Sequence, residues 1–245
     1  KALKKLSNLL VDFETNFTKN GGKVLWANDA DDAKQMIYNI LNQEKVKKIV
    51  KSKSSTIEEI GLIPFLEMKK VKVVETNIGD FVCHLFNERP YDIHSSAAHK
   101  TTSKVAELYT EKFGIKENCN AKQLTICTKQ LLKSDMLNPE TLITGANFLV
   151  SNTGTVVLTE NEGNILKSSA FAPVHIIVAG IDKIITSIDE LSVLLPLSSY
   201  YEVNRNSSFY NLINKPKTEG DKVQKLYLIL LNNNRTNVLA KEKQR

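Results

Sequence analysis

The spacing of apolar residues predicts that the chain opens with a helix. At the start of the chain the apolar positions recur at steps of three and four, which places them on one face of a helix. These positions are Leu3, Leu6, Leu10, Phe13 and Phe17. Gly21-Gly22 then ends the helix, because glycine tolerates the left-handed backbone geometry of a helix C-cap.

The alternation of elements continues as far as Glu75 and predicts an α-β-α-β-α-β order. The predicted elements are strands at Lys23–Ala27, Lys48–Lys51 and Val71–Glu75, with helices from about Asp29 and over about Ser55–Met68. Helices of this length between strands favour a parallel sheet with helices on its faces. Right-handed crossovers are expected between successive strands.

The second half of the chain is predicted to add a helical subregion and an antiparallel hairpin. Two helical patterns, at about 101–113 and 121–137, form the subregion at about 100–140. The apolar runs Phe148–Ser151 and Thr155–Thr159 flank Asn152-Thr153-Gly154, which is a typical hairpin turn. The other predicted elements are strands at 174–179 and 225–231, a helix at 189–195 and a functional or mobile loop at 198–222.

Together these elements predict one α/β domain over residues 1–245. Because of the hairpin, we expect a mixed, mostly parallel sheet flanked by helices. The sequence shows no internal repeat and no linker between separate domains. Its composition, 42% hydrophobic and 24% charged, is typical of a globular chain rather than a disordered one.

Composition and charge exclude several other classes of protein. No apolar run approaches the roughly 18 residues of a membrane span, and no signal peptide is visible, so we expect a cytoplasmic protein. Cys83, Cys119 and Cys127 show no CxxC spacing, and the histidines show no metal-binding spacing, so we predict no metal site. The net charge of +6 is concentrated near the two ends of the chain rather than in one basic module, which argues against a nucleic-acid partner.

The first candidate site follows the predicted strand at Lys48–Lys51. It combines two ammonium groups, several hydroxyls and the backbone N–H groups at a helix start, a pattern that suits a carboxylate or phosphate. Its residues are Lys51, Ser52, Lys53, Ser54 and Ser55. The alternative is a helix N-cap at Ser54 or Ser55, which would account for one serine but not for the whole run.

The second candidate site spans Gly- and Asn-rich segments around the predicted hairpin. Glycine lets the backbone approach a ligand closely, and amide side chains can hold its polar groups. The candidate binding residues are Thr144, Gly145, Asn147, Thr153, Gly154 and Asn164. Glu162, which follows an apolar strand and precedes a glycine, is a candidate general base or nucleophile. The alternative is two ordinary turns, in which Asn and Gly are expected.

Histidine adds one further candidate. His99 precedes a predicted helix start and is a candidate proton-transfer group at the mouth of a site. His175 lies within an apolar strand, where a hydrogen-bonded core histidine is expected. The sequence contains no P-loop, GxGxxG, GxSxG or HExxH motif, so the common nucleotide-binding, hydrolase and zinc-protease functions are not supported.

Several of these segments, taken in order, resemble the lactate-utilisation (LUD) domain family. The resemblance covers nearly the whole chain, and the ordered set is more specific than any one motif. The segments are Asn20-Gly21-Gly22 with Trp26-Ala27, Val50–Ser54 with Glu58–Leu62, His99-Lys100, Thr144–Phe148, Thr153–Leu158, Glu160–Asn164, Val174–Ile176 and Leu231–Arg235. Within the family the chain is most similar to the B-type iron–sulfur subunit of a bacterial L-lactate oxidation system.

The resemblance implies a fold like that of sugar-phosphate isomerases and CoA transferases (the NagB/RpiA/CoA-transferase-like fold). It also implies a part in oxidising L-lactate to pyruvate, together with two partner proteins. B-type relatives carry a C-terminal ferredoxin-like module that binds [4Fe–4S] clusters, and this chain ends at about the point where that module would begin. We therefore expect this chain itself to bind no cofactor.

On this interpretation four residues hold the carboxylate of a small organic acid: Lys51, Lys53, Ser54 and Ser55. Glu162 or His99 moves the hydroxyl proton, and the two electrons pass to a cofactor from elsewhere. Two alternatives stay open. One is a CoA-transferase-like or isomerase-like enzyme that uses Glu162, and the other is a non-catalytic module that binds an organic acid and docks partners.

Overall fold

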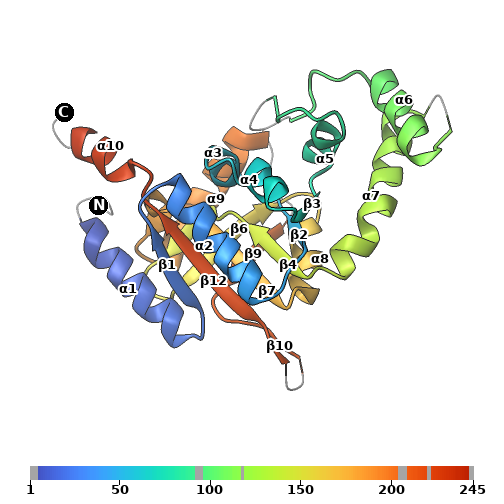
Figure 1. Cartoon of the computed structure of the whole chain (residues 1–245). Coiled ribbons are helices and arrows are strands. Elements are labelled where there is room, and N and C mark those ends of the chain that lie inside the picture. The colour runs from blue at the N-terminus through green and yellow to red at the C-terminus, as the bar shows by residue number, and fades with distance from the viewer. Residues whose placement is uncertain (1–4, 92–95, 117–118, 204–208, 220–221, 243–245) are drawn as a thin grey trace.

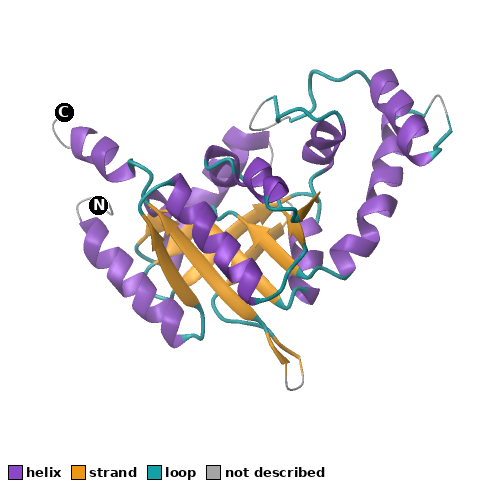
Figure 2. Ribbon diagram, in the orientation of Figure 1, coloured by secondary structure: helices purple, strands orange, loops and turns teal. Residues whose placement is uncertain are grey.

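The computed structural model describes residues 5–91, 96–116, 119–203, 209–219 and 222–242. Six strands form its central sheet: β1 (Lys23–Ala27), β2 (Lys48–Lys51), β3 (Lys72–Glu75), β4 (Thr141–Thr144), β7 (Val174–Gly180) and β12 (Lys225–Leu231). All of them are parallel, in the order β1-β12-β7-β4-β2-β3 (Figures 1 and 2). Five of these strands were predicted, whereas β4, although as long as β2 and β3, was not.

Both faces of this sheet are buried, which explains the unbroken apolar runs of its central strands. In β12, Tyr227, Ile229 and Leu231 pack into one core cluster. Leu228 and Leu230 pack into a second cluster on the opposite face. A strand covered on both sides has no polar face, so periodicity alone does not reveal what covers it.

Helices cover one face of the sheet, and a helix with a second sheet covers the other. The first face packs against α2 (Ala30–Gln43), α3 (Ser55–Glu59) and α4 (Leu62–Met68). The opposite face packs against α1 (Leu6–Lys19) and the second sheet. The strands of the second sheet are β5 (Phe148–Val150), β6 (Thr155–Glu160), β8 (Ile184–Ile185) and β9 (Phe209–Ile213).

The predicted hairpin is confirmed, but it belongs to the second sheet. β5 and β6 pair antiparallel, while β8 pairs parallel with β5. The predicted α/β fold, with mostly parallel strands flanked by helices, is confirmed. The larger sheet is entirely parallel, and the antiparallel pairing lies in the smaller, mixed sheet. A hairpin specifies only the pairing of its own two strands, so its sequence does not say which sheet they join.

Three helices form a group beside the sheet, at the right in Figure 1: α5 (Ile78–Leu85), α6 (Thr102–Phe113) and α7 (Ala121–Leu137). They share a small core, in which Tyr109 Oη and Thr128 Oγ1 are hydrogen-bonded at 2.6 Å. The last turns of α7 pack against the sheet instead, through Leu132 and Met136. The two helices predicted for this region, α6 and α7, are both present.

Two other predicted segments differ from the structure. The helix expected over 55–68 is divided into α3 and α4, because Gly61 adopts a left-handed φ of 63°. The segment 198–222, predicted as a loop, includes the end of a helix and β9, which pairs antiparallel with β6. Residues 204–208 and 220–221 of that segment lie outside the described residues. The remaining elements are α8 (Asn164–Phe171), η2 (Ile181–Lys183), η3 (Ile188–Glu190), α9 (Leu191–Val203), β10 (Thr218–Glu219), β11 (Lys222–Val223) and α10 (Arg235–Glu242).

Gly154 in the hairpin turn provides a test of how the second sheet packs on α1. It has a φ of 65°, and a Cβ at this position would overlap the backbone of Asn16 and Phe17. Gly114, after α6, has the same φ but open space around it. We expect Gly114→Ala to lower the free energy of unfolding by about 1–2 kcal/mol. Gly154→Ala should lower it by clearly more in urea denaturation, and equal losses would mean that α1 does not constrain the turn.

Candidate functional site

The carboxyl ends of β2, β3 and β4 meet at one edge of the sheet, because these neighbouring strands are parallel. Ligand sites in open α/β sheets lie beyond this edge. Here the chain passes from β2 to α3 through Ser52–Ser54, from β3 to α5 through Thr76-Asn77, and from β4 to β5 through Gly145–Asn147. Both candidate segments therefore begin at the same edge.

A buried ion cluster lies where β2 and β3 end. Lys51 is fully buried, and the parallel register places it opposite Glu75. Its Nζ donates to Glu58 Oε1 at 2.7 Å and to both carboxylate oxygens of Glu75 at 3.1 Å. It also lies 3.8 Å from Asp80 Oδ2. The Lys51 ammonium therefore faces three carboxylates of the chain itself, whereas the sequence placed it against a ligand.

The cluster raises the pKa values of both Lys51 and Glu75. Burial acts to lower the pKa of Lys51, but the charges of Glu75, Glu58 and Asp80 outweigh it. Burial raises the pKa of Glu75 to about 7, with Lys51 opposing the shift and the other two carboxylates adding to it. Asp80 is buried as well, and one of its oxygens accepts a hydrogen bond from the Ser96 hydroxyl. Near neutral pH the Glu75 carboxyl is thus present in both protonated and ionised forms.

The serines that follow Lys51 have different environments. Ser52 is buried, and its Oγ has no hydrogen-bond partner among the described residues. Ser54 is the N-cap of α3, since its Oγ accepts the Ile57 backbone N–H at 3.3 Å. The cap was the alternative interpretation of this segment. Gly145 packs directly on Ser54, where a Cβ would overlap the serine hydroxyl, so the two candidate segments are in contact.

Seven of the predicted site residues line one cavity of about 440 Å³, which we name the Glu162 cavity. These seven are Lys53, Ser54, Ser55, Gly145, Asn147, Glu162 and Asn164. The rest of its wall is formed by Thr56, Asn77, Ala146, Leu158, Thr159, Glu160, Asn161, Ile165 and Lys183. The cavity thus brings together a lysine, two serine hydroxyls and a carboxylate from segments that are far apart in the sequence.

Glu162 is held at the wall of this cavity by neighbouring donors. Its Oε1 accepts a hydrogen bond from Asn77 Nδ2 at 2.8 Å, and the Ile78 backbone N–H also donates to the carboxylate. Burial raises the pKa of Glu162, and Ile78 and the charges of Lys129 and Lys53 only partly oppose the shift. A carboxyl group with a raised pKa is suited to accept a proton near neutral pH.

Two neighbours of Glu162 have partners within the protein. Asn164 Nδ2 donates to Thr76 Oγ1 at 2.9 Å, which joins α8 to the loop after β3. Glu160, which sequence reasoning missed, accepts the backbone N–H groups of Ile165 at 2.7 Å and Leu166 at 2.9 Å. Its carboxylate therefore occupies the N-terminus of α8, where the helix dipole favours a negative charge.

The two histidines considered in the sequence also have partners. Thr144 Oγ1 and His175 Nε2 are hydrogen-bonded at 2.9 Å, and burial lowers the pKa of His175 to about 3. This is the neutral core histidine that the apolar strand predicted. His99 Nε2 lies 2.8 Å from Glu88 Oε2, and its ring packs against Tyr91. His99 lines neither the Glu162 cavity nor the larger cavity described below.

The remaining predicted residues belong to the β5–β6 hairpin. Asn147 Oδ1 accepts the Thr159 backbone N–H at 2.9 Å at the base of the hairpin, beside the cavity. Thr153 and Gly154 lie at its turn, where Asn20 Nδ2 donates to the Thr153 carbonyl at 3.1 Å. Neither Thr153 nor Gly154 lines the two cavities, because the hairpin carries its turn to α1.

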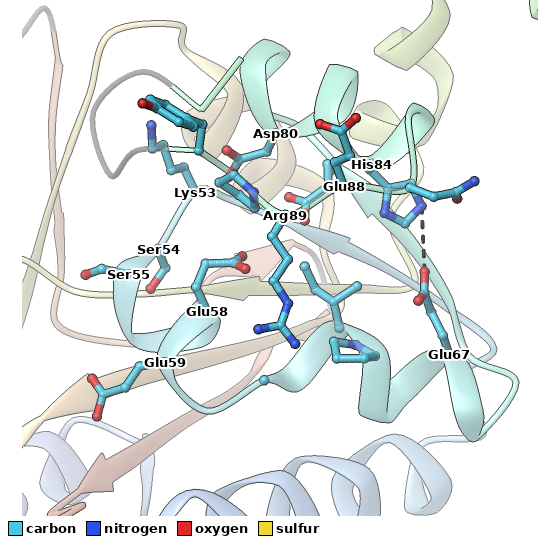
Figure 3. Close-up of a pocket in the computed structure, with 17 residues that line it drawn as sticks. Lys53, Ser54, Ser55, Glu58, Glu59, Glu67, Asp80, His84, Glu88 and Arg89 are labelled. Carbon is cyan, nitrogen blue, oxygen red and sulfur yellow. Dashed lines mark ion pairs between the residues drawn. The ribbon is translucent and has the colours of Figure 1, made fainter. Parts of the chain in front are cut away.

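A larger cavity of about 700 Å³ shares Lys53, Ser54 and Ser55 with the first, and we name it the Asp80 cavity (Figure 3). The rest of its wall is formed by Glu58, Glu59, Gly61, Ile63, Pro64, Glu67, Glu75, Asp80, His84, Asn87, Glu88, Arg89, Pro90 and Tyr91. Sequence reasoning missed the buried carboxylates of this wall. The available signal was Glu75, which ends an apolar strand with a charge opposite to that of Lys51.

The described residues do not fit an iron–sulfur cluster. Such a cluster needs four cysteine thiolates, and Cys83 is buried with its Sγ donating to the Ser96 carbonyl at 3.1 Å. In the described ranges, no group of three or more His, Cys, Asp and Glu side chains could hold a metal ion. The helices of the same ranges include none that is long and apolar enough to cross a membrane.

The sequence matches the LUD domain family over residues 10–238, so the chain belongs to this family, as the ordered motifs predicted. It is 31% identical over 246 residues to lactate utilization protein B of Geobacillus sp. (strain WCH70), a match covering 99% of this chain and 52% of that protein. The protein of the same name from Bacillus subtilis (strain 168) is also 31% identical over 246 residues, covering 99% of this chain and 51% of that protein.

A third relative is the uncharacterized electron transport protein YkgF of Escherichia coli (strain K12), 31% identical over 243 residues, 97% of this chain and 51% of that protein. The chain thus spans about half the length of the curated relatives it matches. Among solved structures, a DUF162 family protein from Deinococcus radiodurans matches with a TM-score of 0.51 and 13% identity, covering 93% of this chain and 98% of that one. This likeness supports the predicted α/β fold.

The raised pKa of Glu75 predicts that stability depends on pH. The folded protein keeps a proton on Glu75 where the unfolded chain has released it, so this group lowers the free energy of unfolding as the pH rises from 4.5 to about 7. We expect Glu75→Gln to remove this decrease in the free energy of unfolding, which amounts to at most about 3 kcal/mol over the whole range. Urea denaturation across this range measures it, with the exposed Glu107→Gln as control. Identical slopes in Glu75→Gln and the wild type would contradict the assignment.

Proposed function

We propose that this chain is the organic-acid-binding domain of a lactate-utilisation protein. Membership of the LUD family and the names of its relatives support lactate, or a similar small hydroxy acid, as the substrate. The observation that carries the proposal is the presence of Lys53, Ser54, Ser55 and Glu162 in the wall of one cavity. A volume of about 440 Å³ leaves ample room for a three-carbon acid.

The carboxylate of the acid binds to Lys53 and to the serine hydroxyls. Lys53 supplies a positive charge at the cavity wall. Ser54 Oγ uses a lone pair to cap α3 and keeps its hydroxyl hydrogen for the carboxylate. Ser55 adds a second hydroxyl. Lys51 takes no direct part, because the carboxylates of the buried cluster already hold its ammonium group; it supports the strand end that leads to Lys53.

Glu162 accepts the hydroxyl proton of the acid. Asn77 orients its carboxylate, and burial raises its pKa toward the range in which a base works best. We assign this role to Glu162 rather than to His99, since His99 is paired with Glu88 outside the cavity. Oxidation of a hydroxy acid to a keto acid also releases two electrons and a second proton. These pass to an acceptor that other subunits of a cytoplasmic lactate-oxidising complex supply.

Binding of L-lactate, measured by isothermal titration calorimetry, tests the role of Lys53. We expect Lys53→Ala to weaken binding by about tenfold or more, since a hydrogen bond to a charged group contributes roughly 1.5–3 kcal/mol. Lys104→Ala removes an exposed lysine from α6 and is the matched control, which should bind like the wild type. Equal affinities of Lys53→Ala and the wild type would remove the anion site from the proposal.

The pH dependence of the same binding tests the position of Glu162. An ionised Glu162 repels a bound carboxylate, so the affinity of the wild type for L-lactate should fall as the pH rises through the raised pKa of this group. Glu162→Gln keeps the shape of the side chain but cannot ionise, so its affinity should stay constant over that range. If both proteins show the same pH dependence, Glu162 does not face the bound acid.

A further inference from the structure

The Asp80 cavity contains groups that the proposed function does not use. Asp80 lines this cavity and is only 3% exposed, yet its Oδ2 finds no hydrogen-bond donor in the described part of the chain. Lys51 Nζ forms an ion pair with this oxygen at 3.8 Å, but that distance is too long for a hydrogen bond. A buried carboxylate oxygen without a donor is costly, so a ligand that supplies one would be favoured.

The charges around Asp80 favour a donor that is itself positive. Glu58, Glu75 and Asp80 surround a single ammonium group, that of Lys51. Even when Glu75 is protonated, two carboxylates share one positive charge. A cationic donor would balance this charge, whereas a neutral hydroxyl would satisfy only the hydrogen bond. Since the described residues contain no group suited to a metal ion, an ammonium group is the cation that fits.

Arg89 brings a charge of the opposite sign into the same cavity. Its guanidinium makes no hydrogen bond or ion pair with the described residues, and Figure 3 shows the Arg89 side chain extending into the cavity. A guanidinium group binds a carboxylate through two parallel hydrogen bonds. The cavity therefore offers an acceptor for an ammonium group and a donor for a carboxylate.

We propose that the Asp80 cavity binds a zwitterionic amino acid. The ammonium group of the ligand donates to Asp80 Oδ2, and its carboxylate pairs with Arg89. An apolar side chain of the ligand packs on Ile63, Pro64 and Tyr91, which line the same space. The volume of about 700 Å³ accommodates a branched apolar amino acid. Lys53, Ser54 and Ser55 line both cavities, but the contacts proposed here, with Asp80 and Arg89, are separate from those proposed for the acid in the Glu162 cavity.

Three compounds with one carbon skeleton test whether the ammonium group is recognised. L-leucine carries an ammonium group, (S)-2-hydroxy-4-methylpentanoate carries a hydroxyl in its place, and 4-methylpentanoate carries neither. Each compound is titrated against isotope-labelled L-leucine bound to the whole chain, so that hydroxy acid held in the Glu162 cavity is not counted. We expect the hydroxy acid to displace L-leucine about tenfold or more weakly than unlabelled L-leucine does. Equal binding of the three compounds, or no binding of L-leucine, would overturn the proposal.

Variants then locate the bound ligand. Asp80→Asn keeps the size of the side chain but removes its charge, so it should abolish the preference for L-leucine over the hydroxy acid. Arg89→Gln should weaken all three compounds by a similar factor, because each has a carboxylate. Asp12→Asn removes an exposed carboxylate from α1 and should change nothing. If Asp80→Asn kept the preference, the ammonium group would bind elsewhere and the proposal would fail.

Two further measurements keep the outcome clear. Because Asp80 is buried, thermal unfolding is used to show that Asp80→Asn is folded before it is titrated. Arg89 is exposed, so Arg89→Gln is a second test, and unchanged L-leucine binding by this variant would overturn the proposal by itself. L-lactate is titrated in parallel with L-leucine. A wild type that binds L-lactate but not L-leucine would count against this site. A wild type that binds L-leucine but not L-lactate would count against the proposed function.

Discussion

The parallel pairing of β2 with β3 sets the geometry on which both cavities depend. Its register ends the two strands with Lys51 beside Glu75, both buried, where the Lys51 ammonium group needs carboxylate partners. Glu58 from α3 and Asp80 from α5 complete the cluster, so the helices that follow both strands are tied to one ammonium group. The loops between strand and helix, including the one that carries Lys53, are thereby held in place.

Two lysines of the same short run therefore have different roles. Lys51 is hydrogen-bonded to carboxylates of the protein itself, and it stabilises the end of β2. Lys53, two residues further on, lines both cavities together with Ser54 and Ser55. One segment therefore lies between two cavities, one lined by Glu162 and the other by the buried carboxylates and Arg89.

The candidate site could be predicted in part because its first elements are local. A strand that ends in a Ser- and Lys-rich turn before a helix places that turn at the edge of a parallel sheet, so the sequence predicted Lys53 and Ser55 as site residues from their position, and both line the cavity. Glu162 was predicted from its place between an apolar strand and a glycine, and it lines the same cavity. Asp80 and Arg89 lay in a stretch without a clear period, and their relevance depends on which strands are neighbours. β4, which lies between β7 and β2, was not predicted.

By itself the sequence determined most of the helices and strands, their alternating order with the parallel pairing that this favours, and the family to which the chain belongs. Hydrophobic periodicity, caps and turns act over a few residues and can be recognised locally. Only the tertiary structure decided that the hairpin joins a separate sheet, that Thr153 and Gly154 pack on α1, and that Lys51 meets carboxylates instead of a ligand. These outcomes depend on contacts between segments distant in the sequence, which local patterns do not encode, and on the high cost of burying a charge without a partner.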